Sequence, residues 1–223
     1  MVTTSRRALP PPPVFFVSYA RPPGRPPGEG GRLTDPMTDH RDFFADLKSC
    51  VNQLLPIPAG HPVGFMDTGL EAGARWTDEL LLNLAGCRVF IALLSARYVQ
   101  LSAWCPMEWD YFARRSVRSK PNTLARPNAT AIIPVLWAPV AAPMPPMVAR
   151  IQRFTPPLVV DPQHRLMYES EGVLGMQQLD RSAYTALVWT LAREVQNVWA
   201  NLEVQPSARR TTTGLIRSFP AGA

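Results

Sequence analysis

The chain has 223 residues, of which 46% are apolar, and a formal net charge of +6. This length supports one sizeable hydrophobic core and leaves too little chain for two full domains. The positive excess lies at the two ends, because residues 1–31 hold four arginines against one glutamate and residues 207–223 hold three arginines and no acidic residue. A protein that grips nucleic acid with its fold concentrates Lys and Arg on the folded body, so nucleic acid is disfavoured as the main ligand.

The cysteines Cys50, Cys87 and Cys105 are odd in number and widely spaced, with no CxxC pair and no histidine in metal-ligand spacing. This pattern is typical of free thiols in a reducing cytosol and indicates no metal site. The N-terminus lacks the apolar core of a signal peptide, and the longest apolar run, residues 89–94, is far short of the ~20 residues that a membrane helix needs. We therefore expect a cytoplasmic protein without a membrane span.

The first part of the chain predicts a disordered arm, a central strand and a long loop. Residues 1–13 end in four prolines and hold few large apolar side chains, so they cannot offset the entropy of ordering. Residues 14–19 (Val-Phe-Phe-Val-Ser-Tyr) read as a strand buried on both faces. Residues 21–38 contain five prolines and four glycines, which predicts an insertion at the carboxyl end of that strand.

Strands and helices then alternate along the chain. A helix is expected from Asp39 to the prolines at 56 and 58, and strands are expected at 63–66, 88–95 and 131–137. Helices with apolar stripes separate them, one carrying Trp76 and one spanning 103–115. Pro134 interrupts the last of these strands, and its missing N–H suits an edge or a bulge. The alternation predicts an α/β fold, a flavodoxin-like doubly wound parallel sheet of about five strands with helices on both faces.

The last third of the chain is less regular. A short helix is expected at 146–152, an extended piece at 158–160, and a long final helix that ends before Pro206. We predict a single domain over residues 14–202, followed by a flexible basic tail over 203–223.

Three segments carry a resemblance to a known family. They are residues 15–21 on the first strand (Phe-Phe-Val-Ser-Tyr-Ala-Arg), residues 65–73 after the second, and residues 95–108 after the third. The last contains Ser-Ala-Arg-Tyr followed by Trp-Cys-Pro-Met-Glu, which is similar to the Ser-x-x-Tyr and Trp-Cys-x-x-Glu signature of TIR (Toll/interleukin-1 receptor) domains. The sequence thus resembles a TIR domain. The Pro/Gly insertion, residues 131–137 and residues 168–184 are further similar to the TIR-like protein of bacterial FxSxx-COOH peptide maturation systems.

The resemblance implies one of two functions, and fold alone does not choose between them. The first is hydrolysis of the nicotinamide–ribose bond of NAD⁺, which would be a substrate and not a cofactor. Nicotinamide leaves as a neutral molecule and needs no general acid, so one carboxylate near the ribose can stabilise the oxocarbenium-like transition state. Glu108 is the candidate catalytic residue. The structural alternative is that Glu108 caps its helix or pairs with Arg114, Arg115 or another arginine.

By resemblance, further residues would bind the substrate. Tyr19, Ala20 and Arg21 would line the NAD⁺ site, Trp76 would stand near the nicotinamide, and Ser95 would border the pocket. Trp104 shares a helix face with Glu108 and gives the carboxylate an aromatic neighbour. Structural alternatives remain open: Tyr19 fills the strand end, Trp76 faces the core, and Ser95 is an N-cap.

The second function is a scaffold that signals through contacts between TIR domains. The loop formed by residues 67–73 reaches into a neighbouring copy in TIR assemblies, and its candidate interface residues here are Asp67, Gly69, Leu70 and Gly73. The glycines permit an extended loop and Leu70 supplies an apolar tip. An ordinary solvent-facing turn is the alternative. The implied partners are further copies of this chain, other TIR proteins or proteins of peptide maturation.

Other enzyme classes are disfavoured. No glycine-rich phosphate loop follows a predicted strand, which argues against a dehydrogenase or an ATPase. His40, His61 and His164 form no recognisable nucleophile set with a serine, and we interpret them as surface or packing residues.

Overall fold

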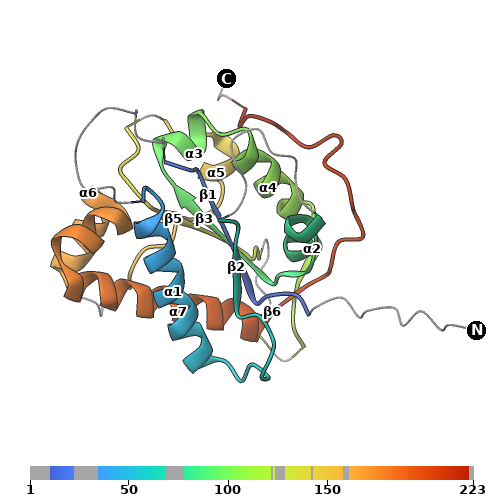
Figure 1. Ribbon diagram of the computed structural model, residues 1–223, viewed down its shortest axis with the longest axis horizontal. Coiled ribbons are helices and arrows are strands. Elements are labelled where there is room, and N and C mark those ends of the chain that lie inside the picture. The colour runs from blue at the N-terminus through green and yellow to red at the C-terminus, as the bar shows by residue number, and fades with distance from the viewer. Residues whose placement is uncertain are drawn as a thin grey trace, which may run out of the picture.

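The computed structural model describes residues 11–22, 35–68, 78–121, 123, 129–141, 143–157 and 161–220. Within them, four strands form one parallel sheet in the order β2-β1-β3-β5 (Figure 1). The strands are β1 Phe15–Tyr19, β2 Gly64–Met66, β3 Val89–Leu94 and β5 Ile132–Leu136. The predicted flavodoxin-like fold class is confirmed. The remaining strand candidate, at 158–160, lies outside the described residues.

Helices cover both faces of this sheet, as Figure 1 shows. Helices α1 and α7 pack together on one face, and α2 and α4 lie on the other. The bounds are α1 Thr38–Leu54, α2 Asp78–Gly86, α3 Ala96–Gln100, α4 Trp104–Ala113, α5 Pro146–Ala149, α6 Pro162–Leu179 and α7 Arg181–Asn201. Every residue of β3 is buried, as expected of a parallel strand with helices on both sides.

Strand β1 lies in the interior of the sheet between β2 and β3, and its composition explains the position. Its residues are aromatic or β-branched except for Ser18, which is nevertheless only 1% exposed. Ser18 pairs in register with Ala92 of β3, and Tyr19 pairs with Leu93 near the carboxyl end of the sheet. A single polar side chain is thus buried where β1 ends.

Strand β5 forms an edge of the sheet, in agreement with the expectation for Pro134. The backbone N–H of Phe154 donates to the carbonyl of Pro134 at 2.8 Å, and the N–H of Leu136 donates to the Tyr168 hydroxyl, also at 2.8 Å. Pro134 itself offers no N–H that would need a partner. Within the described residues, two backbone groups on the outward side of β5 are thus hydrogen-bonded by a loop and by a side chain.

Helix α6 was not expected from the sequence, because its apolar residues do not form a continuous stripe. Its start is capped by Asp161, whose side chain accepts from the Gln163 N–H. Gly172 interrupts the helix with a φ of 69° and lies against the Trp137 carbonyl, which a Cβ at this position would approach to 2.7 Å. Only glycine fits both the backbone conformation and this close approach.

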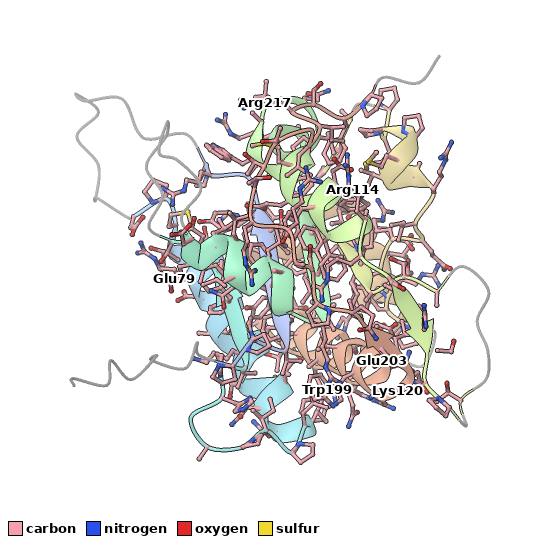
Figure 2. All side chains as sticks on the ribbon, turned by 90° about the vertical axis from the view of Figure 1, so that its right-hand side faces the viewer. Glu79, Arg114, Lys120, Trp199, Glu203 and Arg217 are labelled. Carbon is pink, nitrogen blue, oxygen red and sulfur yellow. The ribbon has the colours of Figure 1, made fainter. Side chains whose placement is uncertain are left out.

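The segment after α7 differs from the predicted flexible tail. Strand β6 (Leu202–Val204) pairs antiparallel with β4 (Val117–Ser119), and the Lys120 ammonium donates to the Trp199 carbonyl at 2.7 Å; Lys120, Trp199 and Glu203 lie close together in Figure 2. Residues 205–220, which we call the C-terminal strap, then run along the outer side of α2 and α4 toward α3 (red in Figure 1).

The strap is held by apolar anchors that the sequence pattern did not reveal. Leu215 and Phe219 are buried, whereas Arg217 between them is exposed and lies on the same face of the molecule as Arg114 (Figure 2). Two buried side chains among prolines, threonines and arginines are too few to give a periodic signal. The predicted mobile arm 1–13 and the insertion 21–38 fall largely outside the described residues.

Among the described residues, no helix is both long and apolar enough to cross a membrane. In the same part of the chain, no group of His, Cys, Asp or Glu side chains is arranged to hold a metal ion.

Candidate functional site

Glu108 is held on a helix whose start is well defined. The Ser102 hydroxyl accepts hydrogen bonds from the backbone N–H groups of Trp104 and Cys105, at 3.2 and 3.1 Å. Pro106 follows in the first turn, where a missing N–H costs no intrahelical hydrogen bond. The proline that precedes Glu108 is therefore compatible with the helix, and the carboxylate is carried on its second turn.

The side chain of Glu108 ends in a buried chain of hydroxyl groups. Glu108 is 8% exposed, and its Oε2 accepts a hydrogen bond from the Ser18 hydroxyl at 2.5 Å. The Ser18 and Tyr98 hydroxyl oxygens are 3.0 Å apart. When Glu108 is ionised, Ser18 gives its one proton to the carboxylate, so Tyr98 is then the donor to Ser18. Strand β1, helix α3 and helix α4 thus meet at one hydrogen-bonded line.

The described residues do not support the structural alternative for Glu108. Arg114 forms a bidentate pair with Asp110, at 2.9 and 2.7 Å, and Arg115 donates to backbone carbonyls. Within the part of the chain that the structure describes, no basic side chain pairs with Glu108. Burial raises the pKa of Glu108 to about 8, the Ser18 hydrogen bond opposes this shift, and the charge of Asp67 adds to it.

Tyr19, Arg21 and Asp67 surround the same carboxyl edge of the sheet. The Tyr19 hydroxyl donates to the Asp67 carbonyl at 2.5 Å. Burial raises the pKa of Tyr19 to about 12; Arg21 opposes the shift, and Asp67 and Glu108 add to it. The Arg21 Nη2 is buried without a hydrogen-bond partner, and the Arg21 carbonyl accepts from Arg97 Nε at 3.1 Å. The Arg21 guanidinium therefore lies beside Tyr19 and retains hydrogen-bonding capacity.

An aromatic cluster borders this edge. The His40 ring lies between Tyr19 and Trp137, with centroid distances of 5.0 and 4.2 Å. His40 is 5% exposed, and burial lowers its pKa to about 4, so it is neutral at physiological pH. The interpretation of His40 as a packing residue agrees with this position.

The structure brings only some of the sequence-predicted site residues together. Tyr19 has Arg21, Glu108 and Asp67 as electrostatic neighbours, and Asp67 was expected at an interface. Ala20 and Trp104 are partly buried, the latter one turn before Glu108. Ser95 is the N-cap of α3 and accepts from the Tyr98 N–H at 3.2 Å, as its structural alternative held. The remaining site residues lie outside the described residues: Trp76, Gly69, Leu70 and Gly73.

Sequence reasoning did not single out Ser18 and Tyr98 as partners of Glu108. Both were part of the quoted motifs, but their contacts span 80 and 90 positions of the chain. One signal was available for Ser18: it is the only polar side chain before the terminal tyrosine of an otherwise apolar strand. A buried hydroxyl in such a position needs a partner, which points to a polar group on the helix above it.

A large open cleft of about 1460 Å³ lies elsewhere, between the start of β5, residues 150–157 and α7. Trp189 and Arg193 are among its lining residues, and Glu108 is not. The cleft is therefore separate from the candidate site.

The comparison with protein families agrees with the motifs and the fold. A model of the TIR domain family matches residues 44–156, a segment that runs from α1 past β5 and includes Glu108. The chain therefore belongs to the TIR domain family, whose members act in signalling and defence and associate through contacts between TIR domains. Neither the curated proteins nor the solved structures provide a match.

Proposed function

We propose that this TIR-domain protein hydrolyses NAD⁺ to nicotinamide and ADP-ribose, with Glu108 as the reacting carboxylate. The observation that supports the proposal most directly is the burial of Glu108 without a cation in the described structure. Burying a carboxyl group in this way costs stability, and structural carboxylates avoid the cost by pairing. Ligands of open parallel sheets bind at the carboxyl ends of the strands, where Glu108 lies.

The chemistry requires the ionised form of Glu108. Nicotinamide in NAD⁺ carries a positive charge, and a cation near a carboxyl group favours its ionisation. Bound substrate would thus lower the pKa of Glu108 from about 8 and place a negative charge beside the ribose. The bond between C1′ and the nicotinamide nitrogen breaks, its electron pair leaves with neutral nicotinamide, and a water oxygen bonds to C1′ with release of one proton.

The same edge offers cationic groups for the rest of the substrate. Arg21 has a buried Nη2 without a partner, and Arg97 lies beside it through the hydrogen bond to its carbonyl. A guanidinium is well suited to a phosphate oxygen because it donates in a planar fork. We assign Arg21 to the diphosphate of NAD⁺, with Arg97 as its neighbour.

Access to Glu108 is limited in a single copy, since only 8% of its surface is exposed. Self-association is a general property of TIR domains. We therefore expect cleavage to increase when copies are brought together, because contacts between copies can shift the chain toward an open site.

The test is nicotinamide release from NAD⁺, measured for the dilute protein and for the protein clustered on a surface. Glu108→Gln keeps the shape and the Ser18 hydrogen bond but cannot ionise, so it should reduce cleavage by about a hundredfold or more. Glu169→Gln is the matched control, since Glu169 is an exposed glutamate paired with Arg165 on α6. Equal cleavage by the native protein and Glu108→Gln would exclude the assigned role.

The alternative proposal is an interaction scaffold without catalysis, acting with further copies or with proteins of a peptide maturation system. The observation that favours it is the closed, hydroxyl-bonded state of Glu108. If clustered native protein releases no nicotinamide, the hydrolase proposal fails and the scaffold proposal stands.

A further inference from the structure

The C-terminal strap contacts the residues of α4 that directly follow Glu108. The Phe219 ring packs edge-on against Trp109 at 6.0 Å between centroids. The Ile216 N–H donates to Asp110 Oδ2 at 3.1 Å, and the Tyr111 hydroxyl donates to the Arg209 carbonyl at 2.7 Å. The helix that carries Glu108 is therefore enclosed between the sheet and the strap, which explains why residues 105–112 are all buried.

The strap also contacts the chain of hydroxyl groups, at Tyr98, the residue of that chain farthest from Glu108. Phe219, which is 8% exposed, stacks on the Tyr98 ring at a centroid distance of 6.0 Å and an interplanar angle of 24°. When Glu108 is ionised, Tyr98 in turn donates to Ser18, and Ser18 donates to Glu108. One line of contacts thus runs from the strap to the carboxylate.

We propose that the strap positions the Glu108 carboxylate: Phe219 fixes the Tyr98 ring, the Tyr98 hydroxyl orients Ser18, and Ser18 orients Glu108. Phe219, Tyr98 and Ser18 are positioning residues in this arrangement. For activity, the inference rests on the proposed function, because orientation of Glu108 matters to NAD⁺ only if Glu108 reacts. The coupling itself exists without substrate and can be measured without it.

The titration of Glu108 can be measured separately from that of the groups that face it. Ser18 and Tyr19 come from β1, Tyr98 from α3, Cys105 from α4, and Asp67 follows β2. Burial raises the pKa of Tyr98 and of Cys105 well above their ordinary values, so both stay protonated near neutral pH. A carboxyl signal of Glu108 that changes near pH 8 therefore reports Glu108 itself.

The experiment follows this signal by carbon NMR of protein labelled at the glutamate carboxyl, with Glu108→Gln used for assignment. The Ser18 hydrogen bond lowers the pKa of Glu108, so Ser18→Ala should give the largest upward shift. Tyr98→Phe removes the donor that polarises Ser18 and should give a smaller upward shift. Phe219→Leu retains an apolar side chain but removes the ring contact, and should shift the titration in the same direction.

A double variant distinguishes positioning of Glu108 through Tyr98 from a general loosening of the packing around the strap. If Phe219 acts through Tyr98, Phe219→Leu combined with Tyr98→Phe shifts the Glu108 titration no further than Tyr98→Phe alone. Arg217 is an exposed residue of the same strap, so Arg217→Ala is the control and should leave the Glu108 titration unchanged. Circular dichroism and thermal melting establish that each variant is folded.

Three results would overturn the inference: a Phe219→Leu titration equal to that of Arg217→Ala, a downward shift that indicates water entry, or additive shifts in the double variant. In the cleavage assay, Phe219→Leu should lower kcat and leave KM unchanged, because Phe219 contacts no substrate group. If the native protein does not cleave NAD⁺ but the titrations are coupled, the proposed function fails and the positioning line stands.

Discussion

Glu108 on helix α4 and Arg115 in the turn after it are buried ionisable side chains with opposite surroundings. Arg115 donates to three backbone carbonyls, those of Leu84, Cys87 and Gln205, at 2.7 to 3.0 Å. Glu108 receives one hydroxyl hydrogen bond and a raised pKa. Arg115 joins α2, the turn after α4 and the strap through these three hydrogen bonds, although its Nη2 has no hydrogen-bond partner. Glu108 is instead buried with one hydrogen bond, at a cost in stability that a functional role would explain.

The largest effect on stability is expected at Arg115. Arg115→Met keeps most of the apolar stem but leaves three carbonyl groups without their donor, so the free energy of unfolding should fall by about 3 kcal/mol or more. Denaturant unfolding of the two proteins measures this difference. A loss below about 1 kcal/mol would contradict the structural role and weaken the contrast with Glu108.

Substitution of Glu108 should change the free energy of unfolding in the opposite direction, and the change should depend on pH. Its pKa is about 8 in the folded protein and about 4.5 when unfolded, so its contribution is fully present below pH 4.5 and is lost as pH rises toward 8. Each unit of this interval costs about 1.4 kcal/mol. Glu108→Gln cannot ionise, so it avoids this loss of stability. Its free energy of unfolding at pH 8 should exceed that of the native protein by a few kcal/mol.

Unfolding at pH 5 and at pH 8 separates this effect from a general one. The gain from Glu108→Gln should be small at pH 5 and large at pH 8. An equal gain in the free energy of unfolding at both pH values, or a loss at pH 8, would contradict this prediction. It would mean that the protein stabilises the buried, ionised Glu108 better than its surroundings indicate.

A smaller effect is expected at Asp110, which links α4 to the strap. Asp110→Asn weakens the bidentate pair with Arg114 and the hydrogen bond from the Ile216 N–H, so the free energy of unfolding should fall by about 1 to 2 kcal/mol. Hydrogen exchange should accelerate in residues 209–219 more than in the sheet. Arg165→Ala, which breaks an exposed pair with Glu169, provides the control and should cost about 0.5 kcal/mol or less.

The sequence predicted those parts of the molecule whose position follows from local patterns. The runs at 14–17 and 89–94 are apolar throughout because parallel strands in the middle of a sheet are covered on both faces. Pro134 marked an edge because it lacks the N–H that an interior strand needs. Glu108 could be named as a candidate because it follows a recognisable motif.

Other parts depend on contacts between distant residues and left no such pattern. Ser18 is 90 positions from Glu108 and 80 positions from Tyr98, so the geometry of this line appears only once β1, α3 and α4 are assembled. The strap was predicted to be flexible because Leu215 and Phe219 are isolated among small and charged residues. The rings that contact Phe219, those of Tyr98 and Trp109, come from the distant helices α3 and α4. Helix α6 was missed since Gly172 interrupts its periodicity.

The edge at β5 limits how copies of this chain can associate. Pro134 has no N–H to offer, its carbonyl is occupied by Phe154, and the N–H of Leu136 is occupied by Tyr168. Two backbone groups of β5 are thus occupied and a third donor is missing, which disfavours addition of a neighbouring copy's strand at this edge. The other edge of the described sheet is β2, so an assembly that extends the sheet would use β2, and one that does not would use helix and loop surfaces.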